Sequence, residues 1–175
     1  MATFKLDPMH SEVHFKITHL MISTVSGSFS KFDATMESAL PDFSDAKVHF
    51  DIETSSISTN NEQRDVHLKS PDFFDVAKYP KITFESTNIK KYNDKSLLLT
   101  GNLTMHGITN AVSFTIDFHG TMKDGYGQVK SGFDAEGKLN RSKFGLVWNA
   151  PTETGGFLVS DEVKLQLSVQ MVKQA

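Results

Sequence analysis

The feature that most constrains this chain is an alternation of apolar and polar residues with a period of two. A period of two is typical of β-strands with one dry face, because successive side chains of a strand point to opposite sides of the sheet. Seven segments repeat the pattern, and their inward faces are Val13, Phe15 and Ile17; Val48, Phe50 and Ile52; Ile82 and Phe84; Leu97, Leu99, Gly101 and Leu103; Val112, Phe114, Ile116 and Phe118; Val129, Ser131, Phe133 and Ala135; and Val163, Leu165, Leu167, Val169 and Met171. The pattern indicates an all-β fold.

Residues 24–37 form an eighth segment, in which the alternation slips by one residue. Its faces are Val25, Gly27 and Phe29 at odd positions, followed by Phe32, Ala34 and Met36 at even positions. We interpret the slip as a β-bulge, because an extra residue bends a strand and helps a sheet to curl. Short connections with Gly and Asp separate the segments and predict antiparallel neighbours. A chain of 175 residues suits one domain, so we expect a single eight-stranded antiparallel barrel over residues 1–175.

One stretch breaks the alternation and predicts one short helix over about residues 61–70. An Asn at its start is a candidate cap, acidic residues follow early, and Pro71 ends it. On this helix, Arg64, Asp65 and His67 have two interpretations. They tie the helix to the barrel rim through hydrogen bonds to loop backbone, or they form an anion clamp and a base.

Charge and composition exclude several classes of protein. The net charge is −3 and no run of like charges concentrates positive potential, so a nucleic-acid-binding surface is not expected. The chain has no Cys, which removes disulfides, thiolate metal sites and a cysteine nucleophile. No stretch approaches the ~18 consecutive apolar residues that cross a bilayer, so no integral membrane segment is expected. The first residues lack a signal pattern, which predicts a cytoplasmic protein for the sequence as given, or a periplasmic one if a signal was removed.

An eight-stranded barrel is just wide enough to be filled by its own side chains or to hold one slender ligand. The inward-facing candidates are the same in both cases: Phe15, Ile17, Phe29, Phe50, Ile52, Phe84, Leu99, Phe114, Ile116, Phe133, Leu146, Trp148, Leu165 and Leu167. Periodicity alone leaves both interpretations open, because 14 Phe are enough to plug the interior.

A set of ordered motifs spans nearly the whole chain. The motifs are His10-Ser11 with Val13-His14-Phe15 and His19; Gly27-Ser28-Phe29 with Ser56-Ile57-Ser58-Thr59; Arg64-Asp65-Val66-His67-Leu68-Lys69-Ser70-Pro71-Asp72-Phe73-Phe74-Asp75; Tyr79-Pro80 with Ile82-Thr83-Phe84-Glu85-Ser86-Thr87; Gly101-Asn102-Leu103-Thr104-Met105-His106-Gly107-Ile108-Thr109; and Asn140-Arg141 with Phe144-Gly145 and Ser160-Asp161-Glu162-Val163. In order and spacing this set resembles the YceI-like polyisoprenoid-binding proteins.

The resemblance implies a lipocalin-like antiparallel barrel with an open lumen that carries a polyprenyl chain, a prenylated quinone or a fatty-acid derivative. It therefore favours the fourteen inward-facing residues as the lining of a cavity. It also implies a protein that binds and carries or sequesters its ligand, with no enzymatic activity and no cofactor besides a bound lipid. Burial of apolar carbon supports such binding, at ~0.8 kcal/mol per methylene. Two alternatives stay open: an enzyme that acts on a prenyl lipid, and a plugged barrel that serves as an interaction module.

Five polar residues are candidates for the head group of such a ligand or for the barrel rim: His19, Arg64, His67, His106 and Arg141. Each also has a structural interpretation, as in the turn at His106, where the imidazole would bond loop backbone. No catalytic or metal-binding residue is predicted, because histidines on one strand cannot surround a metal without ligands from other strands. Exposed sheet edges can pair between subunits and YceI-like relatives are often dimeric, so a homodimer is expected.

Overall fold

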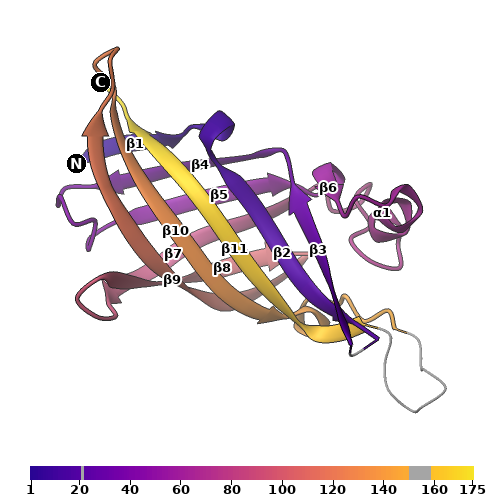
Figure 1. Ribbon diagram of the computed structural model, residues 1–175. Coiled ribbons are helices and arrows are strands. Elements are labelled where there is room, and N and C mark those ends of the chain that lie inside the picture. Colours follow the sequence, from indigo (N-terminus) through magenta and orange to yellow (C-terminus); the bar gives the residue numbers. More distant parts are fainter. Residues whose placement is uncertain (21, 150–158) are drawn as a thin grey trace.

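The computed structural model describes residues 1–20, 22–149 and 159–175, and its strands wrap into a closed barrel (Figure 1). The strands are β1 (Ala2–Leu6), β2 (Glu12–His19), β3 (Ser23–Phe29), β4 (Phe32–Ser38), β5 (Lys47–Glu53), β6 (Ile57–Ser58), β7 (Lys81–Lys91), β8 (Ser96–Met105), β9 (Ile108–Lys123), β10 (Val129–Asn140) and β11 (Val159–Lys173). The helices are α1 (Glu62–Lys69) and the 3-10 helices η1 (Pro8–His10), η2 (Thr54–Ser56) and η3 (Arg141–Phe144).

The strands of the described ranges occupy eight positions around the barrel. The hydrogen-bonded order is β1-β4-β5-β7-β8-β9-β10-β11, and a pairing between β11 and β1 closes the ring. β11 pairs with β1 near Met171 and with β2 near Leu167, so β1 and β2 are two parts of one position. In the same way β3 extends the position of β4, and β6 extends that of β5. The predicted eight-stranded antiparallel barrel with one short helix is confirmed.

The slip in the alternation of residues 24–37 is an interruption of the strand, so its interpretation as a bulge was wrong. β3 ends at Phe29, β4 begins at Phe32, and the two residues between them lie outside both strands. The Lys31 amide donates to the Ser56 hydroxyl (3.1 Å), and the Lys31 carbonyl accepts from the Glu53 amide (2.9 Å). At Lys31 the backbone therefore bonds the end of β5 and the η2 segment that follows it.

The predicted helix is confirmed as α1. The side chain of Asn61 accepts a hydrogen bond from the Arg64 amide (3.0 Å), which caps the first turn. After α1, the chain turns at Ser70, whose amide donates to the His67 carbonyl (3.1 Å). No helix within the described ranges is long and apolar enough to cross a membrane.

The barrel has two different ends (Figure 1). The chain termini and the β4–β5, β7–β8 and β9–β10 connections lie at one end, which we call the floor end. α1, the β2–β3 and β8–β9 turns and η3 lie at the opposite end, which we call the mouth end. The buried apolar residues fall into two clusters, and one of them gathers at the floor end around Phe4, Phe43 and Phe133.

Candidate functional site

The barrel encloses a cavity of about 570 Å³, within the ~300–1,000 Å³ typical of small-molecule sites. Every strand position of the barrel contributes apolar side chains to its wall. The structure places all fourteen inward-facing candidates on this wall: Phe15, Ile17, Phe29, Phe50, Ile52, Phe84, Leu99, Phe114, Ile116, Phe133, Leu146, Trp148, Leu165 and Leu167. That they contact a ligand stays a prediction.

Glycines on neighbouring strands explain why the phenylalanines do not plug the lumen. A Cβ atom placed on Gly27 would lie 2.1 Å from the ring of Phe15, its neighbour on β2. A Cβ on Gly101 would lie 2.5 Å from the Phe84 ring. Rings that fit into these spaces lie against the sheet, because no side chain separates them from the adjacent backbone. The Phe15 and Phe84 rings therefore lie along the wall and leave the axis of the barrel open beside them.

Phe43 lies across the floor end of the cavity. It sits on the β4–β5 connection, is only 4% exposed, and contributes to the cavity wall. Its ring packs edge-on against Phe118 of β9 and Phe133 of β10, each with centroids 5.1 Å away, and against Phe4 at 5.4 Å. In the strand order, β9 and β10 lie opposite β4 and β5. Phe43 therefore reaches from one side of the barrel to the other and closes this end.

The carboxylate of Asp45 holds the β4–β5 connection in this position. It accepts hydrogen bonds from the Ser38 hydroxyl and from the amides of Ala39 (2.8 Å) and Leu40 (3.3 Å). These bonds, the Ser38 hydroxyl first, lower the pKa of Asp45 below its usual value. Phe43 itself has a φ of 59°, an unfavourable backbone region for an aromatic residue, which indicates that the surrounding contacts fix its conformation.

At the mouth end, Arg64 and Asp65 join α1 to the barrel through Thr59. The Arg64 guanidinium donates to the Thr59 hydroxyl and to the Thr59 carbonyl, both at 2.7 Å. The Asp65 carboxylate accepts from the Thr59 amide (2.9 Å) and from its hydroxyl (2.6 Å). Thr59 is buried, so these charged groups satisfy polar atoms that water does not reach. These contacts therefore support the interpretation that Arg64 and Asp65 tie α1 to the barrel rim.

Three aromatic rings meet beside the mouth. The His67 ring packs edge-on against Trp148 (centroids 4.8 Å apart) and Phe73 (5.1 Å), and Phe73 lies 5.3 Å from Trp148. The Asp72 carboxylate is 2.9 Å from Nε2 of His67. His67 and Phe73 come from α1 and the segment after it, whereas Trp148 follows η3. The cluster thus connects two segments on the rim that are distant in sequence.

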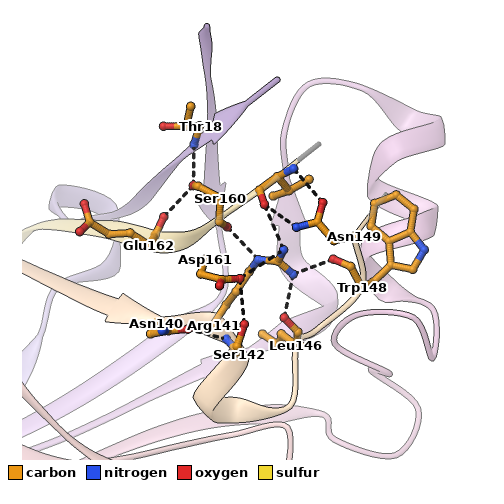
Figure 2. A network of polar contacts seen from close by, with 11 residues as sticks. Thr18, Asn140, Arg141, Ser142, Leu146, Trp148, Asn149, Ser160, Asp161 and Glu162 are labelled. Carbon is orange, nitrogen blue, oxygen red and sulfur yellow. Dashed lines mark hydrogen bonds and ion pairs between the residues drawn. The ribbon is translucent and has the colours of Figure 1, made fainter. Parts of the chain in front are cut away.

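Arg141 organises the segment that carries Trp148, as Figure 2 shows. The guanidinium is buried and donates to the carbonyls of Leu146 (2.7 Å), Trp148 (2.8 Å), Ser160 (2.9 Å) and Val159 (3.3 Å). Burial lowers the pKa of Arg141, and the Asp161 carboxylate, 3.8 Å away, opposes this shift. Since a guanidinium stays charged in proteins, the cation joins two rim segments, the one after η3 and the start of β11, through their main-chain carbonyls.

Comparison with known proteins places this architecture in a family. The YceI-like domain family matches residues 4–171. The chain belongs to the YceI-like domain family. A UPF0312 protein of Staphylococcus aureus (strain bovine RF122) is 40% identical over 171 residues, which is 97% of each chain. The crystal structure of a Campylobacter jejuni YceI protein is 32% identical, covers 91% of both chains and has a TM-score of 0.77.

A more distant structure shares the YceI-like fold alone. It is a polyisoprenoid binding domain from Saccharophagus degradans, implicated in plant cell wall breakdown, with 12% identity, a TM-score of 0.71 and coverage of 98% of each chain. At this identity the likeness extends to the architecture of the barrel and carries no residue-level argument.

The polar candidates of the sequence analysis occupy different places in this YceI-like barrel. His19, Arg64, His67 and Arg141 contribute to the cavity wall at the mouth end. His106 is not among the described residues of the wall: it sits in the β8–β9 turn, where Nδ1 lies 3.1 Å from the Phe144 carbonyl. In the described ranges, no three His, Asp or Glu side chains are grouped in a way that would hold a metal ion.

Sequence reasoning missed the wall residues that come from connections. Phe43, Phe73 and Phe74 line the cavity but belong to no strand, so a period of two does not reveal them. A usable signal for Phe43 was present, because it is a single aromatic residue between Pro41-Asp42 and Ser44-Asp45. An isolated Phe in a polar turn is expected to pack inward, since exposure of its ring to water is unfavourable.

Proposed function

We propose that this YceI-like protein binds one long apolar molecule in its lumen and carries or sequesters it. The ligand classes are a polyisoprenoid, a prenylated quinone or a fatty-acid derivative. One observation carries the proposal: an apolar cavity of about 570 Å³ runs inside the barrel, where glycines let the Phe15 and Phe84 rings lie against the wall. A plugged lumen is not favoured, because a plugged barrel would leave no such volume.

The polarity of the wall supports an orientation for the ligand. Toward the floor the wall is made of residues such as Phe43, Phe133 and Met171, whereas its polar residues, such as Asn61, Gln63 and Arg64, lie at the mouth. An amphiphile in this cavity would bury its tail toward the floor and keep its head group in contact with water, because a polar group loses free energy when it is buried without partners. The head group would then lie beside α1.

The structure favours a binding role over an enzymatic one. Among the candidates for base and anion clamp, Arg64 and Asp65 are engaged with Thr59. His67 packs against Trp148, with its Nε2 2.9 Å from the Asp72 carboxylate, and His106 lies apart from the wall. No specific contact in the described ranges points to a second function. The homodimer and the cellular compartment stay predictions from the sequence.

Native mass spectrometry of gently purified protein tests the proposal. We expect a species heavier than the 19.5 kDa chain by the mass of one lipid, or the appearance of such a species when prenols are offered in detergent. Organic extraction of the same sample should then yield a lipid of matching mass. The apo mass alone, before and after exposure to prenols and fatty alcohols, would overturn the proposal.

A further inference from the structure

We infer that Phe43 determines the specificity of this site by setting the longest chain that the lumen accepts, which its volume limits to roughly 23 carbon atoms. The inference rests on the proposed function, which it extends from a class of ligand to a length. It assigns a role to a residue of the β4–β5 connection, at the end of the barrel remote from α1 and Arg141.

The position of Phe43 makes the lumen a dead end. Its ring extends from the β4–β5 side to Phe118 and Phe133 on the opposite wall, with centroid distances of 5.1 Å to both. Phe118 contacts Phe43 but is not among the described residues of the cavity wall, so it lies beyond the floor. With the head group at the mouth, the tail of a ligand meets the Phe43 ring, and the distance between them limits the length of the tail.

The volume of the cavity converts this limit into a number of carbon atoms. A dry apolar cavity of ~150 Å³ holds benzene, which has six carbons. One buried carbon therefore requires on the order of 25 Å³. A cavity of about 570 Å³ then accommodates roughly 23 carbons. Carbons beyond this number stay in water, and each loses on the order of 4-fold in affinity relative to a buried methylene.

The floor is rigid enough to act as a limit. Phe43 contacts three rings from β1, β9 and β10. Asp45, which follows Phe43, accepts hydrogen bonds from Ser38 and Ala39, which precede it. The Phe43 amide also donates to the Leu40 carbonyl (3.1 Å). For a longer tail to pass, the ring and this hydrogen-bonded connection would have to move together.

A competition among primary alcohols tests the inference. Linear 1-alkanols of 12 to 30 carbons, in steps of two, are offered as an equimolar mixture in detergent, and native mass spectrometry measures which lengths remain bound. In detergent, the tails of all free alcohols are removed from water to the same extent. Occupancy should therefore be highest for the alcohol that fills the lumen, at ~22 carbons for the wild type. Phe43→Ala removes the six ring carbons from the floor, so its optimum should move to alcohols about six carbons longer.

Two further variants keep the test decisive. Phe43→Leu is a smaller change that preserves an apolar floor, and its optimum should lie about two carbons above that of the wild type. Phe118→Ala removes a second phenylalanine ring, on the side of Phe43 that faces away from the lumen, and should leave the optimum unchanged. Circular dichroism establishes that each variant is folded, and if Phe43→Ala is not, Phe43→Leu carries the test.

The outcomes separate this inference from the proposed function. If the wild type binds alcohols and prenols but Phe43 variants keep the wild-type optimum, the length role of Phe43 is wrong and the binding function stands. An equal shift in Phe118→Ala would also overturn it, because the limit would then belong to the whole cluster. Failure of every prenol and alcohol to bind any variant would overturn both.

Discussion

The floor and the mouth of this barrel are built from different interactions. At the floor, Phe43 packs against three other rings, and the contact is apolar and buried. At the mouth, Arg141 and the Thr59 contacts of α1 hold the rim segments by hydrogen bonds, most of them to main-chain atoms. The hydrophobic packing of rings excludes water and has no directional requirement, whereas hydrogen bonds hold their partners at defined distances and angles. The floor end is therefore closed by apolar packing, whereas hydrogen bonds hold the rim segments at the mouth end.

The largest effect on stability is expected at the floor. Phe43→Ala should lower the free energy of unfolding by ~3–5 kcal/mol, because it removes a buried ring and leaves a cavity. Trp148→Ala, at the partly exposed mouth, should cost only ~1 kcal/mol. Urea denaturation measures both values. Equal costs would break the comparison, since they would mean that the mouth cluster is as firmly packed as the floor.

Arg141→Met should have the next largest effect, at the mouth. The change leaves the carbonyls of Leu146, Trp148 and Ser160 without their donor, at a cost of about 3 kcal/mol in unfolding free energy. It should also speed the release of a bound alcohol, because the segment that carries Trp148 loses its support. Denaturation and dissociation kinetics measure the two effects.

Two control variants sharpen the Arg141 prediction. Lys143→Met alters an exposed cation on the same 3-10 helix and should change stability by less than ~0.5 kcal/mol. Arg141→Lys keeps the charge but lacks the planar fork that reaches several carbonyls, so it should not restore the wild-type value. Full rescue by Lys would show that charge alone, and not the pattern of donors, holds the mouth.

The wall of the barrel and its helix could be predicted from the sequence. The wall was predictable, because a period of two marks residues such as Phe15 and Leu165 as inward-facing without knowledge of the register. The helix was predictable as well, since its Asn cap and Pro71 are local signals. The resemblance to YceI-like proteins supplied the expectation that the lumen is open.

The ring partners of Phe43, the strand interruption and the role of Arg141 were not predictable. Phe43 owes its position to rings on strands 75 and 90 residues further along the chain (118 − 43 and 133 − 43). Arg141 bonds carbonyls, which every residue carries, so its partners leave no mark in the sequence. The openness of the lumen depends on which glycine faces which ring, and that requires the strand register.

The wall between the two ends is expected to respond less strongly. Gly27→Ala would place a Cβ atom 2.1 Å from the Phe15 ring, so the ring has to move toward the lumen. Overpacking of this kind costs ~1–3 kcal/mol and should shorten the preferred alcohol in the competition assay. Gly125→Ala is the matched control, since no atom lies within 4 Å of its added Cβ. An unchanged alcohol preference in Gly27→Ala would show that Phe15 does not border the ligand.

The smallest expected effect is a loss of stability in acid at the floor end, which the mouth end should not share. The hydrogen bond from Ser38, followed by those from the Ala39 and Leu40 amides, lowers the pKa of Asp45 below its ordinary value of 3.8. A carboxylate with a lowered folded-state pKa contributes stability above its unfolded-state pKa, and this contribution is lost as the pH falls through the folded value. Asp42, whose pKa is lowered chiefly by the Ser44 hydroxyl, adds to the same acid-side loss.

The Arg141 contacts with main-chain carbonyls do not titrate in this acid range, because the guanidinium stays protonated and carbonyls accept no proton. Hydrogen-exchange protection should therefore fall at the Phe43 and Ala46 amides as the pH drops below about 4, while the Leu146 amide, which donates to the Arg141 carbonyl, keeps its protection. Asp45→Asn should lower protection at the floor at every pH and flatten this change. Equal loss at floor and mouth in the wild type would indicate global acid unfolding and would remove Asp45 as the acid-sensitive contact of the floor.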